Sequence, residues 1–190
     1  MEQSNNENIF DLSKGWDSLA ADLLYANMIC PPVELAFYEA RIRENGGLAL
    51  DQACGSGRHL FPLIELGLEV HGADASADAL RLAENAAEEL GIQPVLFHQR
   101  MEDCDIPHQY GTIYIANGTF QVIGDRQQAF QTLERFRDHL TPGGQLLIEL
   151  FIPETATRGA EIRDAEHPER WDPEPRRGAE GEIVTTLNFI

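Results

Sequence analysis

A glycine-rich loop between a short apolar run and a helical pattern is the feature that most constrains the fold of this chain. Residues 48–50 are apolar, Asp51 ends the run, and Gly55 and Gly57 follow within the next six residues. Glycines let a backbone turn tightly and approach a ligand closely. The start of the following helix offers unpaired N–H groups and the positive end of its dipole. This order of strand, loop and helix predicts a nucleotide-type binding site at the carboxyl end of a strand.

The remainder of the central chain alternates between short apolar runs and helical periodicity. Ser76 is the expected N-cap of the clearest helix, and Gly91 is the residue expected to end it. Such alternation implies right-handed crossovers and a mainly parallel, twisted sheet with helices on both faces, so the predicted fold class is an α/β three-layer sandwich. The predicted strands cover 48–50, 69–73, 95–98, 112–116 and 145–152, a turn covers 141–144, and helices cover 58–66, 76–90 and 125–140.

The 190 residues suit a single domain with three segments. Residues 1–45 are predicted to form N-terminal helices, divided by a Pro-Pro pair, which either close over the site as a lid or pack in the core. Residues 46–152 form the cofactor-binding core, and residues 153–190 form an extended excursion that ends in a final strand. The aromatic residues of the N-terminal segment for which both roles stay open are Trp16, Tyr25 and Tyr38.

The charge and cysteine content exclude several classes of partner. The chain has 14 basic and 32 acidic residues, a formal charge of −18. A field of this sign repels phosphate backbones and anionic lipid surfaces, so neither nucleic acid nor membrane is expected as a partner. We find no signal peptide pattern and no apolar run near the roughly 20 residues that span a bilayer. The dispersed cysteines, Cys30, Cys54 and Cys104, indicate reduced thiols in a cytoplasmic protein without a metal site.

The loop itself separates three kinds of nucleotide site. A dinucleotide fingerprint is Gly-x-Gly-x-x-Gly, and the third position counted from Gly55 is Leu60. No Gly-Lys-Ser/Thr follows, which excludes a P-loop. The acid in the loop, Asp51, would sit badly beside a pyrophosphate and would suit an ammonium group. A dinucleotide site is therefore the weaker alternative to a site for a cationic ligand.

The motifs resemble those of class I S-adenosylmethionine-dependent methyltransferases. Residues 50–58 (Leu-Asp-Gln-Ala-Cys-Gly-Ser-Gly-Arg) resemble motif I, an acid followed by Gly-x-Gly-x-Gly, with Ala53 where the first glycine is usual. Residues 71–76 resemble the second motif, and residues 140–144 resemble the turn into strand five. The resemblance covers about residues 35–155. It implies a Rossmann-like sandwich that binds S-adenosylmethionine and releases S-adenosylhomocysteine.

The resemblance also implies a set of cofactor-binding residues. Asp51 would take the methionine ammonium, Asp74 the ribose hydroxyls, and the loop glycines would line the methionine and ribose. An apolar cover and an adenine acceptor are expected after strand three, where Arg100 stands in place of a common aspartate and Asp103 is the second choice of acceptor. The complete set is Asp51, Ala53, Gly55, Gly57, Asp74, Ala75, Met101 (cover), Glu102 (acceptor), Asn117 and Gly118.

Two neighbours of these residues receive structural interpretations. Cys54 is expected to be a small residue in a tight turn, and His59 is expected on the surface of the following helix.

Residues 116–120 (Ala-Asn-Gly-Thr-Phe) replace the motif that carries the base in amino-methylating DNA enzymes. The acceptor is therefore expected to be a small molecule, methylated on O, N or C, and no catalytic residue can be assigned.

The end of the chain leaves two functions open. Family members usually continue past strand five with a helix and an antiparallel strand pair, so the C-terminal part is interpreted as truncated. Strand five would then be an open edge, unless another chain covers it, the chain is a fragment, or the final strand folds back. We expect association through this edge, as a homo-oligomer or with a partner. The protein is then either an active methyltransferase or a cofactor-binding, catalytically incomplete subunit that needs or regulates a partner chain.

Overall fold

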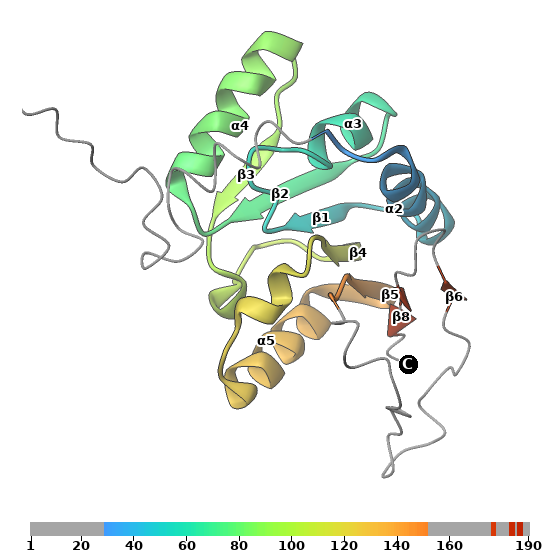
Figure 1. The fold of residues 1–190 in the computed structure, drawn as a ribbon, viewed down its shortest axis with the longest axis vertical. Helices are drawn as coiled ribbons and strands as arrows, with labels where there is room; N and C mark the ends of the chain where they lie inside the picture. The colour runs from blue at the N-terminus through green and yellow to red at the C-terminus, as the bar shows by residue number, and fades with distance from the viewer. Residues whose placement is uncertain (1–28, 152–175, 178–182, 185, 188–190) are drawn as a thin grey trace, which may run out of the picture.

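The computed structural model describes residues 29–151, 176–177, 183–184 and 186–187, and it shows a central sheet between two layers of helices (Figure 1). The larger sheet has the strand order β3-β2-β1-β4-β5-β8, with parallel pairing from β3 to β5. This confirms the predicted α/β sandwich. The parallel strands are β1 Ala49–Gln52, β2 Val70–Asp74, β3 Val95–His98, β4 Tyr110–Ile115 and β5 Leu140–Ile148.

Each face of the sheet has its own hydrophobic core. On one face, α2 (Pro32–Asn45), α3 (Leu60–Glu65) and α4 (Ala77–Leu90) contribute Ile42, Leu63 and Ala83 to the core. On the other face, α5 (Arg126–His139) and the short 3-10 helix η2 (Met101–Asp103) contribute Phe136 and Met101. The helices thus fix the sheet from both sides and leave the carboxyl ends of β1, β2 and β4 to the loops.

The boundaries of α4 follow from its sequence. The Ser76 hydroxyl accepts a hydrogen bond from the Ala79 N–H at 3.1 Å, and Gly91 ends the helix in the left-handed conformation. Both ends therefore agree with the prediction. Leu90, in the last turn of α4, is exposed. Phe130 of α5 is exposed as well.

Two predicted boundaries shift. The helix predicted from residue 58 begins at Leu60, because the chain first turns through a Gly57 N–H bond to the Cys54 carbonyl oxygen (3.0 Å). The predicted turn over 141–144 lies inside β5, which starts at Leu140. There, the register advances from Tyr110↔Leu140 to Thr112↔Gln145, so β5 bulges beside β4. Gly143, at φ +80°, provides the left-handed residue that this bulge needs.

A short strand near the end of the sequence lies on the edge of β5. β8 (Thr186–Leu187) pairs antiparallel with β5, with Leu187 opposite Leu146. The sequence left three alternatives for this edge: a covering chain, a fragment, or a final strand that folds back. The structure contains the last of these. β6 (Arg176–Arg177) and β7 (Ile183–Val184) form a separate two-stranded sheet. Association with another chain remains a prediction, and the first predicted N-terminal helix, with Trp16 and Tyr25, lies outside the described residues.

Candidate functional site

The loop after β1 is tied to the end of β2. The Ala53 and Cys54 N–H groups both donate to the Ala73 carbonyl oxygen, at 2.7 and 3.0 Å. The Asp74 carboxylate accepts from the Gly55 N–H at 2.7 Å and from the Ser76 N–H at 2.8 Å. The structure thus brings four predicted residues, Asp51, Ala53, Gly55 and Asp74, to one edge of the sheet. Because backbone donors hold both of its oxygens, the Asp74 carboxylate is oriented before any ligand binds.

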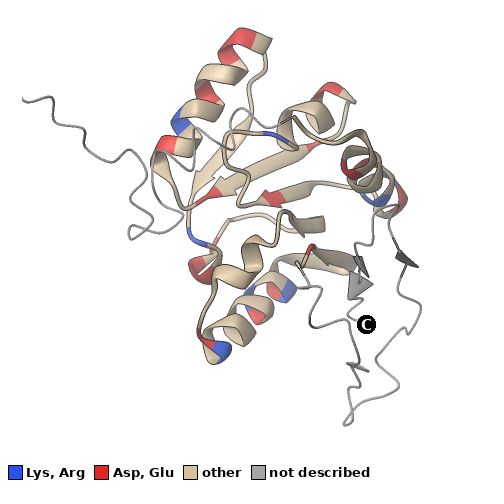
Figure 2. Ribbon diagram, in the orientation of Figure 1, with Lys and Arg blue, Asp and Glu red and all other residues tan. Residues whose placement is uncertain are grey.

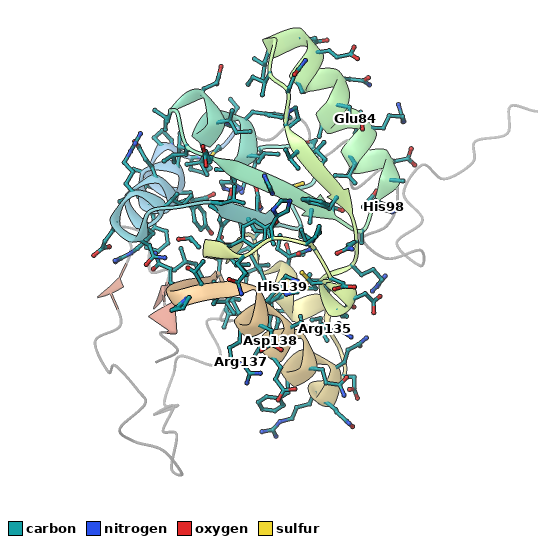
Figure 3. All side chains as sticks on the ribbon, turned by 180° about the vertical axis from the view of Figure 1, so that it is seen from behind. Glu84, His98, Arg135, Arg137, Asp138 and His139 are labelled. Carbon is teal, nitrogen blue, oxygen red and sulfur yellow. The ribbon has the colours of Figure 1, made fainter. Side chains whose placement is uncertain are left out.

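The second predicted residue of this turn, Ala75, is held from β3. The His98 imidazole Nε2 lies 2.9 Å from the Ala75 carbonyl oxygen, at the end of its strand (Figure 3). This contact joins the third strand to the turn between β2 and α4. Hydrogen bonds through loop atoms therefore connect the ends of β1, β2 and β3.

The two loop glycines serve different purposes. An added Cβ at Gly55 would meet no atom within 4 Å, so this side of the loop is open. At Gly57 (φ +93°) the added Cβ would lie 2.2 Å from the Phe61 ring. Gly57 therefore makes room for an aromatic ring of the core, which is a packing reason for a glycine that was predicted to line a ligand. Gly55 is the residue that exposes open backbone.

Ala53 adopts the left-handed conformation, with φ +65°. Its expected departure from Gly-x-Gly-x-Gly is thus a source of backbone strain, because a Cβ disfavours this region by about 1–2 kcal/mol. We expect A53G to raise the free energy of unfolding by about 0.5–1 kcal/mol, since the extra freedom of glycine in the unfolded chain offsets part of the gain. Urea denaturation measures this. A49G, at a buried position of β1 without positive φ, should lower stability; a loss of stability in A53G would contradict the strain.

Asp51 is a buried carboxyl group with an unsatisfied oxygen. The residue is 2% exposed, and its Oδ2 atom has no hydrogen-bond partner. Burial raises the pKa of Asp51 to about 7; the Tyr114 side chain and the Arg58 charge oppose this rise, and the Asp74 charge adds to it. The Tyr114 hydroxyl acts on this carboxyl group. Neither group, however, makes a hydrogen bond of ordinary geometry through the Tyr114 hydroxyl or Asp51 Oδ2. A cation beside Oδ2 would favour the ionised carboxylate.

Unpartnered polar atoms gather at this edge. Among the described residues, four buried side-chain atoms lack a hydrogen-bond partner, and all belong to β1, the residues after it, or the adjacent strand β4: Asp51 Oδ2, Gln52 Oε1, Arg58 Nε and Tyr114 Oη. Buried polar atoms are normally satisfied, and an exception calls for an explanation. A ligand with both donors and acceptors would supply the missing partners.

A buried ion-pair cluster lies beside the loop. The Arg58 Nη2 atom is 3.1 Å from Glu34 Oε2 and also donates to the Asn117 side-chain oxygen. Glu34 lies in the first turn of α2 and Asn117 directly after β4, so three segments meet at one guanidinium. Sequence reasoning missed Arg58 and Glu34 as site residues. The signal was the position of Arg58, directly after the glycine loop.

His59 corrects one expectation. It was predicted on the helix surface, but it is 3% exposed, with its Nε2 atom 3.0 Å from Glu34 Oε2. Burial and the neighbouring Arg58 charge lower the pKa of His59 to about 4, so the ring is neutral near pH 7. The helix starts two residues later than predicted, which turns this side chain toward α2.

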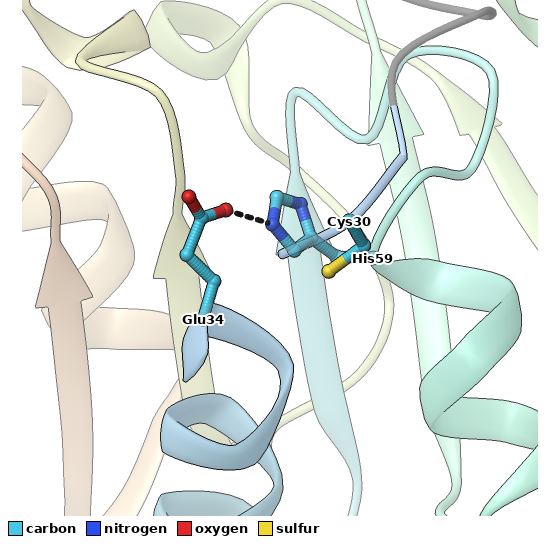
Figure 4. A group of neighbouring side chains, drawn as sticks. All are labelled: Cys30, Glu34 and His59. Atoms are coloured by element: carbon cyan, nitrogen blue, oxygen red, sulfur yellow. Dashed lines mark hydrogen bonds and ion pairs between the residues drawn. The ribbon is translucent and has the colours of Figure 1, made fainter. Parts of the chain in front are cut away.

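Cys30, Glu34 and His59 lie together as three potential metal ligands (Figure 4). Their ligand atoms are all within 4.8 Å of one another. However, Arg58 Nη2 contacts Glu34 Oε2 at 3.1 Å and His59 Nε2 at 3.3 Å, which places a positive charge among these ligands. Burial also raises the pKa of the Cys30 thiol, whereas metal binding requires the thiolate. We therefore interpret the cluster as an ion-paired wall of the site.

The loop after β4 joins this wall to the end of β5. Asn117 and Gly118 both have positive φ, +57° and +64°, and the Asn117 N–H donates to Glu149 Oε2 at 2.8 Å. The Gln121 side chain bonds both the N–H and the carbonyl oxygen of Phe151, at 2.7 and 3.1 Å. The predicted residues Asn117 and Gly118 thus lie in a hydrogen-bonded loop between the Arg58 cluster and the residues after β5.

The residues predicted to contact adenine lie in η2. Met101 is 7% exposed and packs in the core beneath α5. Glu102 forms an ion pair with Arg100 at 2.9 Å, and its own side chain is 9% exposed. Their contact with an adenine ring remains a prediction.

Acidic residues outnumber basic ones on the described part of the chain. Figure 2 shows them along α4 and at the ends of β1 and β2. The acids at these strand ends are Asp51 and Asp74. No helix among the described residues is long and apolar enough to cross a membrane.

Comparison with known protein families finds a match to a family described as "Methyltransferase domain", over residues 49–144. The chain is 28% identical over 127 residues to a dTDP-3-amino-3,6-dideoxy-alpha-D-glucopyranose N,N-dimethyltransferase of Streptomyces fradiae, covering 66% of this chain and 48% of that protein. It is 28% identical to a glycine/sarcosine N-methyltransferase of Halorhodospira halochloris, covering 60% and 43%. The chain thus spans about half the length of the curated relatives it matches.

Solved structures share the fold. The glycopeptide N-methyltransferase MtfA complexed with sinefungin is 26% identical, with a TM-score of 0.59 over 68% of this chain and 53% of that chain. The sugar N-methyltransferase KedS8 from Streptoalloteichus is 22% identical, with a TM-score of 0.61 over 70% and 54%. The residues that match the family, 49–144, include the loop after β1.

Proposed function

Because this chain belongs to the methyltransferase domain family, we propose that it binds S-adenosylmethionine at the carboxyl ends of β1 and β2 and transfers the methyl group to a small-molecule acceptor. The observation that carries the proposal is the buried, unpartnered Oδ2 atom of Asp51 beside an open glycine loop. An ammonium group is the partner that this oxygen lacks. A chain with this site releases S-adenosylhomocysteine as its product.

The residues present fit the cofactor. Gly55 is open to a ligand, and Asp74 has a carboxylate fixed by two backbone donors, as recognition of a ribose diol requires. In this proposal Asp51 binds the ammonium, Asp74 the ribose, and Ala53 and Ala75 contribute backbone around them. Met101 and Glu102 serve the adenine, and Asn117 and Gly118 face the reacting sulfur.

The proposed acceptor is an amine. Two relatives are named for N-methylation of an amino sugar and of glycine or sarcosine. Four acids lie around the loop after β1 and the Arg58 cluster: Glu34, Asp51, Asp74 and Glu149, with Arg58 as a fixed cation beside Glu34. This field attracts an amine in its protonated form, which must lose a proton before it attacks.

Bound S-adenosylmethionine supplies an electrophilic methyl group on a positively charged sulfur. The residues of this chain contribute mainly position: α2 and the Asn117 loop hold the walls, and the loop after β1 holds the amino-acid end. In-line displacement gains much of its rate from such alignment. We assign no residue as the general base. Neutral His59 and the Glu34 carboxylate are already engaged with each other and with Arg58.

The alternative is a cofactor-binding subunit that needs or regulates a partner chain. The pairing of β8 with β5 favours the active enzyme, because the edge that motivated a partner carries a strand of the same chain. A homo-oligomer stays part of the proposal, and sedimentation at micromolar concentration tests it. The free cysteines Cys30, Cys54 and Cys104 support a cytoplasmic location.

Calorimetry with S-adenosylmethionine and S-adenosylhomocysteine tests the proposal. We expect both to bind, and we expect radiolabelled methyl transfer to a panel of amino sugars and amino acids, with matched hydroxy analogues as controls. Binding without turnover on any member would favour the incomplete subunit. Absence of binding by either ligand would overturn both functions.

A further inference from the structure

Arg58 is a buried cation with an unused hydrogen-bond donor. Its side chain is 8% exposed, and its Nε atom is buried without a partner. All of its described side-chain contacts involve Nη2, which faces Glu34, His59 and Asn117. A buried charged donor without an acceptor is unfavourable, so such an atom is expected where a ligand completes it. The acceptor that suits a guanidinium edge is a carboxylate.

A second unused atom, of opposite charge, lies on the other side of the loop. Asp51 is in β1, before the loop, and Arg58 follows the loop; Asp51 Oδ2 and Arg58 Nε are both buried without partners. The two side chains are within electrostatic reach, because the Arg58 charge acts on Asp51. The segment between them contains Gly55, whose open side leaves space for a ligand. An ammonium and a carboxylate on one carbon atom would satisfy both.

The cluster around Arg58 orients the guanidinium in advance. Glu34, from α2, and Asn117, after β4, hold Nη2 from two sides, which leaves Nε–H as the buried donor without an acceptor. Neutral His59 adds no positive charge that would compete for a carboxylate. A planar guanidinium fixed through Nη2 presents its Nε–H to an anion in a fixed direction.

We propose that Arg58 binds the carboxylate of the methionine end of the cofactor, opposite Asp51, so that the loop recognises a complete amino-acid zwitterion. The inference rests on the proposed function. It assigns a ligand-binding role to an arginine that lies directly after the glycine loop. It also gives the Glu34 side chain a positioning role, because Glu34 holds Arg58 without being expected to touch the cofactor.

The test compares S-adenosylmethionine with its decarboxylated analogue, which lacks only the carboxylate. We expect R58Q to weaken binding of S-adenosylmethionine about 10- to 100-fold, as loss of a charge-assisted bond predicts. The wild-type protein should bind the analogue more weakly by a similar factor, and R58Q should bind the analogue about as well as the wild type does. R58K, which keeps the charge but not the planar edge, should give an intermediate loss for S-adenosylmethionine alone.

E34Q is the matched control. It weakens the ion pair on Nη2 and leaves the Nε–H donor in place, so it should reduce affinity for S-adenosylmethionine less than R58Q does. Thermal melting verifies that each variant is folded, and R58K replaces R58Q in the comparison if R58Q unfolds. An equal loss for both ligands in the Arg58 variants would overturn the proposal and assign Arg58 to packing. Failure of the wild type to bind S-adenosylmethionine would instead overturn the proposed function itself.

Discussion

Replacement of Asp51 by asparagine is expected to stabilise the protein and, at the same time, to weaken its binding of S-adenosylmethionine. Burial raises the pKa of Asp51 to about 7 in the folded protein, whereas an unfolded aspartate titrates near ~3.9. Ionisation therefore disfavours folding: the wild type loses stability as pH rises from about 4 to about 7, and the loss is complete above 7. The amide has no such ionisation. We expect the free energy of unfolding of D51N to exceed that of the wild type by about 2–4 kcal/mol at pH 8, and to differ little from it near pH 4.

Urea denaturation of both proteins at several pH values measures this difference. D78N is the control, because it removes an exposed carboxylate at the start of α4, paired with Arg81, in place of a buried one. The same stability difference for D51N at pH 4 and pH 8 would contradict a buried carboxyl that ionises on the way to neutrality.

Binding should move in the opposite direction. An ammonium ligand needs the Asp51 carboxylate, so wild-type affinity should fall about tenfold for each pH unit below 7. Affinity should also fall above about pH 8, where an α-amino group loses its proton. D51N should bind about 10- to 100-fold more weakly at pH 7.5, and its low-pH dependence should disappear. Calorimetric titration at several pH values provides the measurement. Equal affinity of D51N and wild type would remove Asp51 from the site.

The sequence predicts the order of strands and helices because each signal is local. The apolar run before Asp51 needs no distant contact to indicate a strand, and Ser76 caps its helix through a bond to Ala79, three residues away. The same local signals were enough to predict that the glycine loop belongs to a nucleotide-type binding site. Local reasoning also found Ala53 as a departure from the motif, although only the backbone shows that this residue is left-handed.

The parts that could not be predicted depend on packing between distant segments. Arg58 meets Glu34 across 24 residues and Asn117 across 59, and no local pattern indicates that these three side chains meet. His59 was misplaced because it precedes α3, which begins at Leu60, and its buried side chain meets Glu34 of α2, 25 residues away. The positions and contacts of such side chains depend on how distant segments pack, which helical periodicity does not indicate.

Substitution of Gly57 by alanine is expected to destabilise the protein by about 2–4 kcal/mol and to weaken cofactor binding with it. Two effects combine. An alanine at φ +93° is strained, and its Cβ would lie 2.2 Å from the Phe61 ring, which is itself buried in the core. Backbone strain and overpacking each contribute about 1–3 kcal/mol. The ring cannot retreat far without disturbing α3, so the loop that carries Gly55 and Arg58 has to move.

Gly67 provides the matched control, because G67A introduces the same methyl group at φ +79° with no atom within 4 Å of it. We expect G67A to lose about 1–2 kcal/mol from backbone strain alone and to keep its affinity for S-adenosylmethionine. The double variant G57A/F61L should lose less than the sum of the single variants, since the smaller side chain relieves the clash. If G57A unfolds no more easily than G67A, the Phe61 ring does not explain the glycine, and close approach of a ligand to the backbone at Gly57 becomes the better explanation.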